Sequence, residues 1–581
     1  MSTLEIQNQA GWKRYLPFLT WMGRYRSEDL PSDLLAGVIV AIMLVPQGMA
    51  YAMLAGLPPQ VGLYASIVPT LLYGLLGTSR TLAVGPVALT SILVAASVGK
   101  LAPPGEQSYL LMAIALALLV GVMQLLMGLL RLGSIVNFIS HPVLSGFTSA
   151  AAILIALSQL KSLAGLPMAR VEGFAATLWE TYRNLDAVNW PTLAIGVTGI
   201  LILVYFKTGL TQHLKRLKIG PAWRVPITKS GPLVVVVLGT VLVWGLGLNQ
   251  RTGVQVVGQI PSGLPALTLP AFDPESWRIL GSATATISVI AFLESISVAK
   301  ALASRRREKV DPNQELLALG FANLGAAFTG GYPVAGGFAR SVVNFSVGAR
   351  TGLASIITAG LISLTLIFMM SLFFFLPKAI LAAIILVAVV NLVDLASLRR
   401  VWRYSKADAA SLLVTFTTVL VLGIEGGILI GVATALAVHL WRTSRPHVAM
   451  LGRVGESEHY RNVLRHEVEI CPRTLAVRID ESLYFANAQF LENLLLNTVA
   501  ERPELEKMVL VLSAVNFIDA SALESLENLV SELESAGVAL YLAEVKGPVM
   551  DRLYGTGLIN KIGQDRIFLS THQGMQSLGC V

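Results

Sequence analysis

Charged residues are scarce in this chain. They make up 13% of its 581 residues, against roughly 25% in soluble globular domains. Residues 34–79 contain no Lys, Arg, Asp or Glu at all, and shorter charge-free segments recur as far as residue 441. A membrane-spanning helix needs about 20 mainly apolar residues. The scarcity of charge therefore excludes a soluble globular protein and indicates a polytopic membrane protein, whose first charge-free run holds two spans.

Cysteine is rarer still, since Cys471 and Cys580 are the only two and both lie outside the apolar part. We expect them to form neither a disulfide framework nor a metal site. No catalytic triad, metal cluster or phosphate-binding loop is visible, so we predict no cofactor, no metal and no enzymatic activity. No signal peptide is predicted either. The net charge of +8 lies mostly in loops between spans and does not call for nucleic acid.

The apolar segments predict fourteen spans, some of them short. Loops after even-numbered spans, from Arg80 to Lys406 and with Lys300 at a span end included, carry 18 Lys and Arg. Loops after odd-numbered spans, with Lys378 at a span end included, carry seven. Because loops rich in Lys and Arg stay on the cytoplasmic side, we expect both termini in the cytoplasm. The spans lie near residues 34–55, 60–77, 86–99, 108–130, 140–160, 191–206, 231–248, 279–300, 314–329, 339–347, 351–372, 377–393, 408–424 and 426–442.

The composition changes near residue 443. Charges return there, and short apolar strands alternate with amphipathic helical stretches, which is typical of a small α/β domain. We therefore expect four parts: a cytoplasmic N-terminal segment at 1–30, a transmembrane domain at 31–442, a cytoplasmic α/β domain at 443–575 and a tail at 576–581.

Two of the short spans are interrupted by Gly and Pro. SRTLAVGPVALTS breaks at Gly85 and Pro86, and GGYPVAGGFARS breaks at Pro333 and the glycines before Phe338. They are the third and tenth spans, seven apart, which indicates an inverted repeat of seven plus seven spans with a site near the middle of the membrane. Two half-helices that begin inside the membrane aim their N–H groups and positive dipole ends at one point. This arrangement favours an anion.

Glu294 and Arg340 are charged residues within otherwise apolar sequence. A charge near the bilayer centre costs about 2.5–3.5 kcal/mol even on the lenient insertion scale, so a retained charge usually serves function. We interpret the pair as acting on an ion. Two structural alternatives stay open: Arg340 could pin carbonyls of the unwound segment, and Glu294 could be only its partner.

These motifs, in order, resemble the SulP family of anion permeases, which includes plant and bacterial sulfate transporters, pendrin and prestin. The resemblance rests on LLAGVIVAIMLVPQGMAYAMLAGLPPQVGLYAS, SRTLAVGPVALTS and GGFARSVVN, while NFIDASALESLENL is similar to the core of a STAS domain. It covers residues 28–575 and implies a fold divided into core and gate domains, an elevator-like motion and a homodimer in contact with membrane lipid. It also leaves room for a cytoplasmic partner at the STAS domain.

The resemblance to proton-coupled sulfate transporters implies roles for individual residues. Side chains from the first span would face the anion, backbone N–H groups from the two broken spans would bind it, and a fixed positive charge would complete the site. These positions are Gln47, Tyr51, Val84, Gly85, Pro86, Phe338, Ala339 and Arg340. Glu294 would be the carboxylate that responds to protons. Many relatives have Ser where this chain has Ala339, so one hydroxyl ligand is missing here.

The predicted function is secondary active transport of a small oxyanion, with proton-coupled sulfate uptake across a bacterial inner membrane favoured. Sodium-coupled bicarbonate transport and proton-coupled dicarboxylate transport remain alternatives. Two further alternatives come from other classes, namely an anion channel and a non-transporting motor or sensor. Glu294 favours coupled transport over both, because an acid beside the anion site serves coupling better than conduction.

Overall fold

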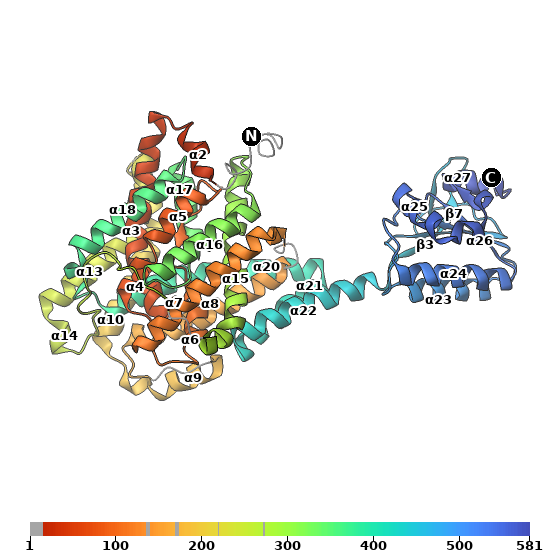
Figure 1. Cartoon of the computed structure of the whole chain (residues 1–581). Coiled ribbons are helices and arrows are strands. Elements are labelled where there is room, and N and C mark those ends of the chain that lie inside the picture. The colour runs from red at the N-terminus through yellow and green to blue at the C-terminus, as the bar shows by residue number, and fades with distance from the viewer. Residues whose placement is uncertain (1–15, 135–139, 169–172, 219, 271–273, 581) are drawn as a thin grey trace. The chain divides into compact units, whose positions relative to one another are not determined.

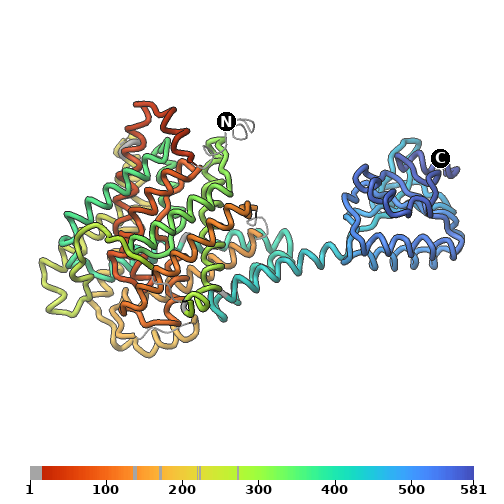
Figure 2. The backbone as a smooth tube through the Cα atoms, in the orientation of Figure 1, coloured from red at the N-terminus to blue at the C-terminus, as the bar shows by residue number. Residues whose placement is uncertain are grey.

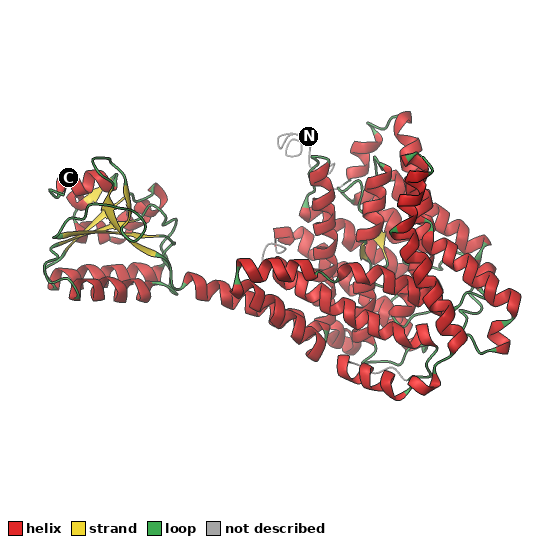
Figure 3. Cartoon of the chain, turned by 180° about the vertical axis from the view of Figure 1, so that it is seen from behind, coloured by secondary structure: helices red, strands yellow, loops and turns green. Residues whose placement is uncertain are grey.

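The computed structural model describes residues 16–134, 140–168, 173–218, 220–270 and 274–580. The chain divides into two compact units, Met1–Ala433 and Thr434–Val581. The first unit is almost wholly helical, while the second combines a sheet with helices (Figures 1 and 3).

Every predicted span coincides with a helix or a pair of short helices. Among the described residues, seven helices are long and apolar enough to cross a membrane, and four shorter ones are also apolar. The helices at the predicted spans are α3 (Leu30–Leu54), α4 (Pro59–Tyr64), α5 (Val68–Leu76), α6 (Ala88–Val98), α7 (Gln107–Leu129), α8 (His141–Ala164), α10 (Trp190–Lys207), α13 (Gly231–Leu246), α15 (Pro274–Arg305), α16 (Pro312–Phe328), α17 (Phe338–Val347), α18 (Leu353–Phe368), α19 (Lys378–Val389), α21 (Lys406–Leu422) and α22 (Ile424–Thr443).

Shorter elements connect these helices. Two strands precede the half-helices, and the remaining helices lie at the N-terminus or between spans. They are α2 (Pro17–Met22), β1 (Val84–Gly85), α9 (Phe174–Arg183), α11 (Gly209–Arg216), α12 (Pro221–Lys229), α14 (Leu248–Arg251), β2 (Ala335–Gly336) and α20 (Leu395–Tyr404). The second predicted span is not continuous, because a turn at residues 65–67 separates α4 from α5.

The packing of the first unit repeats itself between its two halves. Helix α7 packs against α16, and the equivalent pair after an exchange of the halves, α18 and α5, is also in contact. The same exchange relates α3–α18 to α15–α7, and α8–α21 to α19–α10. Figure 2 shows the red and orange tube of the early spans running among the green tube of the later ones. The fold is thus an inverted repeat of seven plus seven elements.

Glycine allows the closest helix contacts in this unit. A Cβ added at Gly62 would lie 1.9 Å from the carbonyl oxygen of Gly48, and one added at Gly352 would lie 2.0 Å from that of Gly74. These contacts bring α3 against α4 and the start of α18 against α5. Small residues at helix contacts are the usual means of close packing between membrane helices.

The second unit is built around a six-stranded sheet with the order β4-β3-β5-β6-β7-β8. Strands β5 to β8 are parallel, whereas β3 pairs antiparallel with β4 and β5. Apolar residues of the strands and of the long helices α23 and α24 form its main core. Its elements are β3 (Val448–Arg453), β4 (Tyr460–Asn462), β5 (Thr474–Ile479), α23 (Ala488–Ala500), β6 (Lys507–Val511), α24 (Ala520–Ser535), β7 (Ala539–Ala543), α25 (Gly547–Thr556), α26 (Leu558–Ile562), β8 (Ile567–Phe568) and α27 (Thr571–Ser577).

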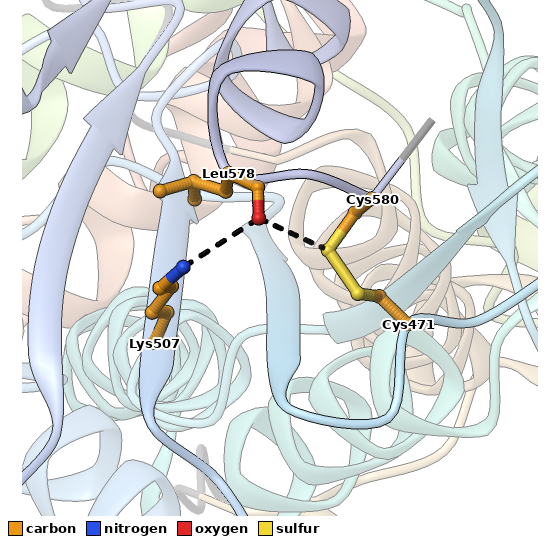
Figure 4. The surroundings of a disulfide bond; sticks show 4 residues. All are labelled: Cys471, Lys507, Leu578 and Cys580. Atoms are coloured by element: carbon orange, nitrogen blue, oxygen red, sulfur yellow. Dashed lines mark hydrogen bonds between the residues drawn. A yellow bond between two sulfur atoms is a disulfide. The ribbon is translucent and has the colours of Figure 1, made fainter.

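The expectation of no disulfide is wrong, because Cys471 and Cys580 are bonded to each other (Figure 4). The two residues are 109 positions apart in the chain, so their spacing alone gave no sign of pairing. Helix α27 returns along β6 and brings the C-terminal segment beside Cys471. Lys507 Nζ donates to the Leu578 carbonyl at 3.5 Å, and the same oxygen lies 4.0 Å from Cys580 Sγ (Figure 4). The disulfide therefore ties the end of the chain to the sheet.

Candidate anion-binding site

The third and tenth spans meet through the short strands β1 and β2. The two strands pair antiparallel, with Val84 opposite Gly336 and Gly85 opposite Ala335, and they stand out in yellow among the helices in Figure 3. Helices α6 and α17 begin two or three residues later, and neither has a side-chain cap at its N-terminus. Their first-turn N–H groups therefore remain free to bind an anion.

Buried hydrogen bonds hold this strand pair in place. Gly337 N donates to the Ala83 carbonyl at 2.9 Å, and Ala83 N donates to Ser341 Oγ, also at 2.9 Å. Gly336 N donates to Ser295 Oγ at 2.7 Å, which ties β2 to α15. Both serines also donate to a carbonyl of the preceding turn, Ser341 to Gly337 at 2.7 Å and Ser295 to Ala291 at 2.6 Å, so neither hydroxyl is free for a substrate. The bracing role of Ser295 had no counterpart among the residues that the sequence singled out.

A second brace comes from α16. Asn323 Oδ1 accepts a hydrogen bond from Val334 N at 2.7 Å, and its Nδ2 donates to Gln124 Oε1 at 2.9 Å. Gln124 Nε2 in turn donates to the Ser288 carbonyl at 3.2 Å. These amides satisfy the backbone where the chain is unwound, which an apolar environment requires. An Asn on an apolar helix next to a Gly/Pro break was the only signal for this role.

Arg340 lies in the first turn of α17 and is only 2% exposed. Its Nη1 donates to Gln47 Oε1 at 3.5 Å, while Nε and Nη2 are buried and have no hydrogen-bonding partner in the described part of the chain. A buried guanidinium with unpaired donors is costly unless an anion meets it. Among the described residues Arg340 forms no ion pair that would meet this need.

Gly337 makes room for this guanidinium. A Cβ at this position would lie 2.6 Å from Arg340 Nη2 and 2.7 Å from Cζ. The arginine side chain therefore folds back over the helix N-terminus, where the positive dipole end and the side-chain charge add together. The Gly-Gly-Phe-Ala-Arg order in the sequence reflects this contact.

Glu294 lies on α15 and is partly exposed, yet its Oε2 atom is buried without a hydrogen-bonding partner. It is near enough to Arg340 for the two charges to interact, but they form no direct ion pair. The carboxyl therefore shares the site with the guanidinium without neutralising it by contact. The arrangement leaves a place between or beside the two groups for a third charged partner.

The two predicted residues of α3, Gln47 and Tyr51, are both buried. Gln47 is 5% and Tyr51 6% exposed. They are one turn apart on the same face, and the Gln47 amide reaches Arg340. Tyr51 also lies near enough to Arg340 to interact with its charge. Both side chains thus face the same region as the tenth span.

The predicted backbone donors fall into two sets. Phe338 is 56% exposed and Ala339 is also exposed, so the start of α17 is open to a ligand. Val84 and Gly85 are buried in the strand pairing, and Pro86 has no N–H to give. The free N–H groups at this end of the third span therefore belong to the first turn of α6, at residues 88–90.

Sequence reasoning missed two other buried carboxylates, Asp33 and Glu315, both 0% exposed. Glu315 Oε1 accepts from Thr78 N and Oγ1 at 2.7 and 2.6 Å, and its Oε2 accepts from Tyr73 at 2.6 Å. Asp33 accepts three hydrogen bonds from the residues before α18. Both lie in polar sequence at a span end, which gave no sign of burial.

The described residues contain no group of His, Cys, Asp and Glu that could hold a metal ion.

The fold, the braced crossover and the open helix N-termini together define a membrane transport protein. Comparison with known proteins identifies the family. Residues 30–415 match the sulfate permease family, and residues 465–574 match the STAS domain. The chain belongs to the sulfate permease (SulP) family and carries a C-terminal STAS domain.

Relatives and solved structures agree with this assignment. The chain is 38% identical to the probable sulfate transporter 4.2 of Arabidopsis thaliana, over 96% of this chain and 83% of the relative. It is 34% identical to the probable sulfate transporter MT1781 of Mycobacterium tuberculosis, over 99% of each. These relatives are transporters rather than enzymes. The structure of the murine solute carrier 26 family member A9 anion transporter in the inward-facing state is similar, with a TM-score of 0.90, 25% identity, and 99% and 96% of the two chains covered.

A more distant likeness supports the fold of the membrane unit alone. The transmembrane domain of the cyanobacterial bicarbonate transporter BicA superposes with a TM-score of 0.58 at 22% identity, covering 71% of this chain and 98% of that one. The chain is therefore a membrane-embedded member of an anion transport family, as the motifs predicted.

Proposed function

We propose that this protein is a secondary active transporter that takes up sulfate together with protons. One observation carries the proposal: Arg340 is buried at the uncapped N-terminus of α17 with two donors that no described protein group satisfies. A tetrahedral dianion could accept from this guanidinium and from the first-turn N–H groups of α6 and α17. Charge-assisted hydrogen bonds of this kind are the strong ones.

In the proposed mechanism Glu294 controls whether the dianion can bind. When it is ionised, Glu294 partly offsets the charge of Arg340 and repels sulfate. When it is protonated, the repulsion disappears and Arg340 is free to hold the anion. The proton and the anion then bind cooperatively, and each raises the affinity of the other by the same factor. The separate positions of the two side chains support this, because no direct ion pair has to break first.

The transport cycle proposed is an elevator. The braced crossover joins α3, α6, α15 and α17 in a core that would move as one body against a gate of α8, α10, α13, α19, α21 and α22. We further propose a homodimer in a bacterial inner membrane, with both termini in the cytoplasm and the domain boundaries given above. A cytoplasmic partner at the STAS domain is part of the same proposal.

Two other cargoes fit the same site. Sodium-coupled bicarbonate transport is consistent with the Glu294 carboxylate, which could bind the cation. Proton-coupled dicarboxylate transport is consistent with the Arg340 guanidinium, which could bind a carboxylate of the cargo. The absence of a hydroxyl at Ala339 bears on the choice, since it removes one hydrogen-bond donor to the anion. The identities of the sequence relatives favour sulfate.

The test is uptake of radiolabelled sulfate into proteoliposomes with and without an inward proton gradient. Bicarbonate and fumarate serve as competitors, and empty liposomes serve as the control. We expect accumulation that depends on the gradient and that only sulfate analogues compete away. Uptake driven by sodium, or absent with sulfate and present with bicarbonate, would overturn the proposed cargo and coupling. Current far above carrier turnover would indicate a channel.

A further inference from the structure

Helix α20, which connects the twelfth and thirteenth predicted spans, carries a group of exposed arginines. They are Arg399, Arg400 and Arg403. None of the three makes a hydrogen bond, an ion pair or a ring contact with a residue that the structure describes. They line an open hollow of about 690 Å³ on the outer side of the helix, together with Leu395, Ala396 and Tyr404. The guanidinium groups are therefore available to a partner outside the chain.

The helical spacing gathers these arginines into one band. Side chains four positions apart are neighbours on a helix surface, so Arg399 and Arg403 form one row. Arg400 lies beside this row, about 100° around the helix axis from Arg399. The opposite side of α20 faces the protein, because Ser397 is buried and Val401 half-buried there. The helix thus turns its basic band away from the rest of the membrane unit.

Apolar and aromatic side chains border the basic band. Leu395 is 72% and Trp402 53% exposed, although both could have been buried against the protein. They lie on the same edge of the helix, because seven positions amount to almost two full turns. Exposed Leu and Trp beside arginine are typical of a helix that lies between lipid and water. Its apolar side chains enter the acyl region there, while its arginines remain among the headgroups.

Short connections hold α20 where two predicted spans end. Residues 393 and 394 separate it from the turn that follows α19, and Ser405 alone separates it from α21. The helix packs against α8 and α21. Asp394 N donates to Ser149 Oγ of α8 at 3.2 Å, and the Asp394 carboxylate caps α20 by accepting from Ser397 N at 2.8 Å. These contacts keep α20 at the level of the lipid headgroups.

The positive-inside rule explains only part of this pattern. The loop that contains α20 follows an even-numbered span, so the rule accounts for basic residues in it. The rule concerns the number of basic residues in a loop, and it requires neither one shared face nor an exposed Trp402 at the edge of that face. A partner with both a negative charge and an apolar part accounts for the arginines and for their apolar border together.

We infer that α20 binds the headgroups of anionic phospholipids such as phosphatidylglycerol. Arg399, Arg400 and Arg403 donate to the phosphate oxygens, for which the forked guanidinium is well suited. Leu395 and Trp402 contact the acyl chains of the same lipids. Phosphatidylcholine binds less well, because its own trimethylammonium group offsets the phosphate charge. This inference goes beyond the proposed function and does not depend on the cargo or on its coupling.

The test places a fluorescent label inside the hollow. Ala396, which lines it, is replaced by Cys in the full chain and coupled to bimane. The native cysteines are bonded to each other, and the chain without the new Cys measures background labelling. The protein is reconstituted into phosphatidylcholine vesicles that contain increasing amounts of a quencher, which is either phosphatidylglycerol or phosphatidylcholine with a nitroxide on its acyl chain.

We expect the anionic quencher to be preferred. Half-maximal quenching should need at least about tenfold less phosphatidylglycerol than phosphatidylcholine, since each arginine near a membrane surface strengthens binding of anionic lipid about fivefold. The preference should shrink at high salt, because the charges are then screened. Equal quenching by the two lipids would overturn the inference. Quenching by neither lipid would also overturn it, because another part of the protein would then cover α20.

Matched variants assign the preference to the arginines. Arg399→Gln, Arg400→Gln and Arg403→Gln should each lower it about fivefold, and the three together should abolish it. Replacing all three by Lys should keep most of it, because the charge is retained. Arg251→Gln removes an exposed arginine of α14 and should change nothing. A preference that survives the glutamine variants would overturn the inference. The single variants keep the test decisive if the triple variant fails to fold.

Discussion

Two pairs of charged residues in the membrane unit differ in whether their polar atoms are satisfied. Asp33 and Glu315 are fully enclosed, and hydrogen bonds from neighbouring loops satisfy both. Arg340 is as deeply buried but keeps two donors unpaired, and Glu294 keeps one buried oxygen unpaired. Satisfied charges fasten one element to another, whereas unsatisfied ones are available to a substrate. The difference separates structural from functional charges without reference to any relative.

The largest effect should follow Arg340→Gln. Losing two charge-assisted hydrogen bonds, each worth about 1.5–3 kcal/mol, should lower sulfate uptake by at least about 100-fold. The melting temperature in detergent should not fall, because the variant removes an unpaired buried charge. Uptake assays and thermal unfolding of the same preparation test both points. A variant that unfolds readily would place Arg340 with the structural charges.

Glu315→Ala should give the reverse result. It leaves the Tyr73 hydroxyl and the Thr78 donors without their acceptor, so we expect the free energy of unfolding to fall by about 1–3 kcal/mol for each unsatisfied donor. Transport per folded molecule should stay close to that of the wild type. Thermal unfolding measures the loss of stability, and uptake normalised to the amount of folded protein measures transport. Normal stability together with lost uptake would contradict the assignment of Glu315 as a structural charge.

Glu294→Gln should remove proton coupling while sulfate binding survives. The amide imitates the protonated carboxyl, so accumulation should no longer respond to a proton gradient. Counterflow exchange of sulfate, measured with preloaded proteoliposomes, should persist. Normal gradient-driven accumulation in this variant would show that the proton acts elsewhere.

Gly337→Ala should have a smaller effect on the same site. The added Cβ would lie 2.6 Å from Arg340 Nη2, so the guanidinium must move. We expect about a tenfold loss of affinity for sulfate, since one hydrogen bond to a charged group is weakened. Gly360→Ala is the matched control, because a Cβ there meets nothing within 4 Å. Equal affinities in both variants would contradict the placement of Arg340.

The smallest effect concerns a carboxylate of the second unit. Partial burial would raise the pKa of Asp480, but hydrogen bonds from Arg478 and His447 outweigh it and hold the pKa below its usual range. This contribution to stability is present above the pKa of the unfolded chain, near 4. It is lost as the pH falls through the lower folded value. Asp480→Asn should therefore destabilise this unit by less than about 1 kcal/mol at pH 7 and flatten its acid dependence. Amide hydrogen exchange in β5, measured as a function of pH in the wild type and in Asp480→Asn, would show this difference in stability.

Much of the membrane fold could be predicted from the sequence because charge-free length and Gly/Pro breaks are local signals. The spans and the repeat of seven spans followed from them, whereas the place of Gln47 near the anion site came only from the family resemblance. The bracing by Ser295 could not be predicted, since its backbone partner Gly336 is 41 residues away in the chain. For Asn323 the only signal was an amide on an apolar helix next to the Gly/Pro break. The burial of Asp33 and Glu315 and the Cys471–Cys580 pairing depend on tertiary contacts in the same way. Pro86 has no backbone N–H, so chemistry alone excludes it as a donor.

The most direct test of the account is calorimetric titration of sulfate into the purified protein and into Arg340→Gln, repeated in buffers of different ionisation enthalpy. The account predicts binding to the wild type that is accompanied by proton uptake, because proton and anion bind together. It predicts no measurable binding to Arg340→Gln. Sulfate binding of wild-type strength in Arg340→Gln, or binding with no proton uptake in the wild type, would contradict it.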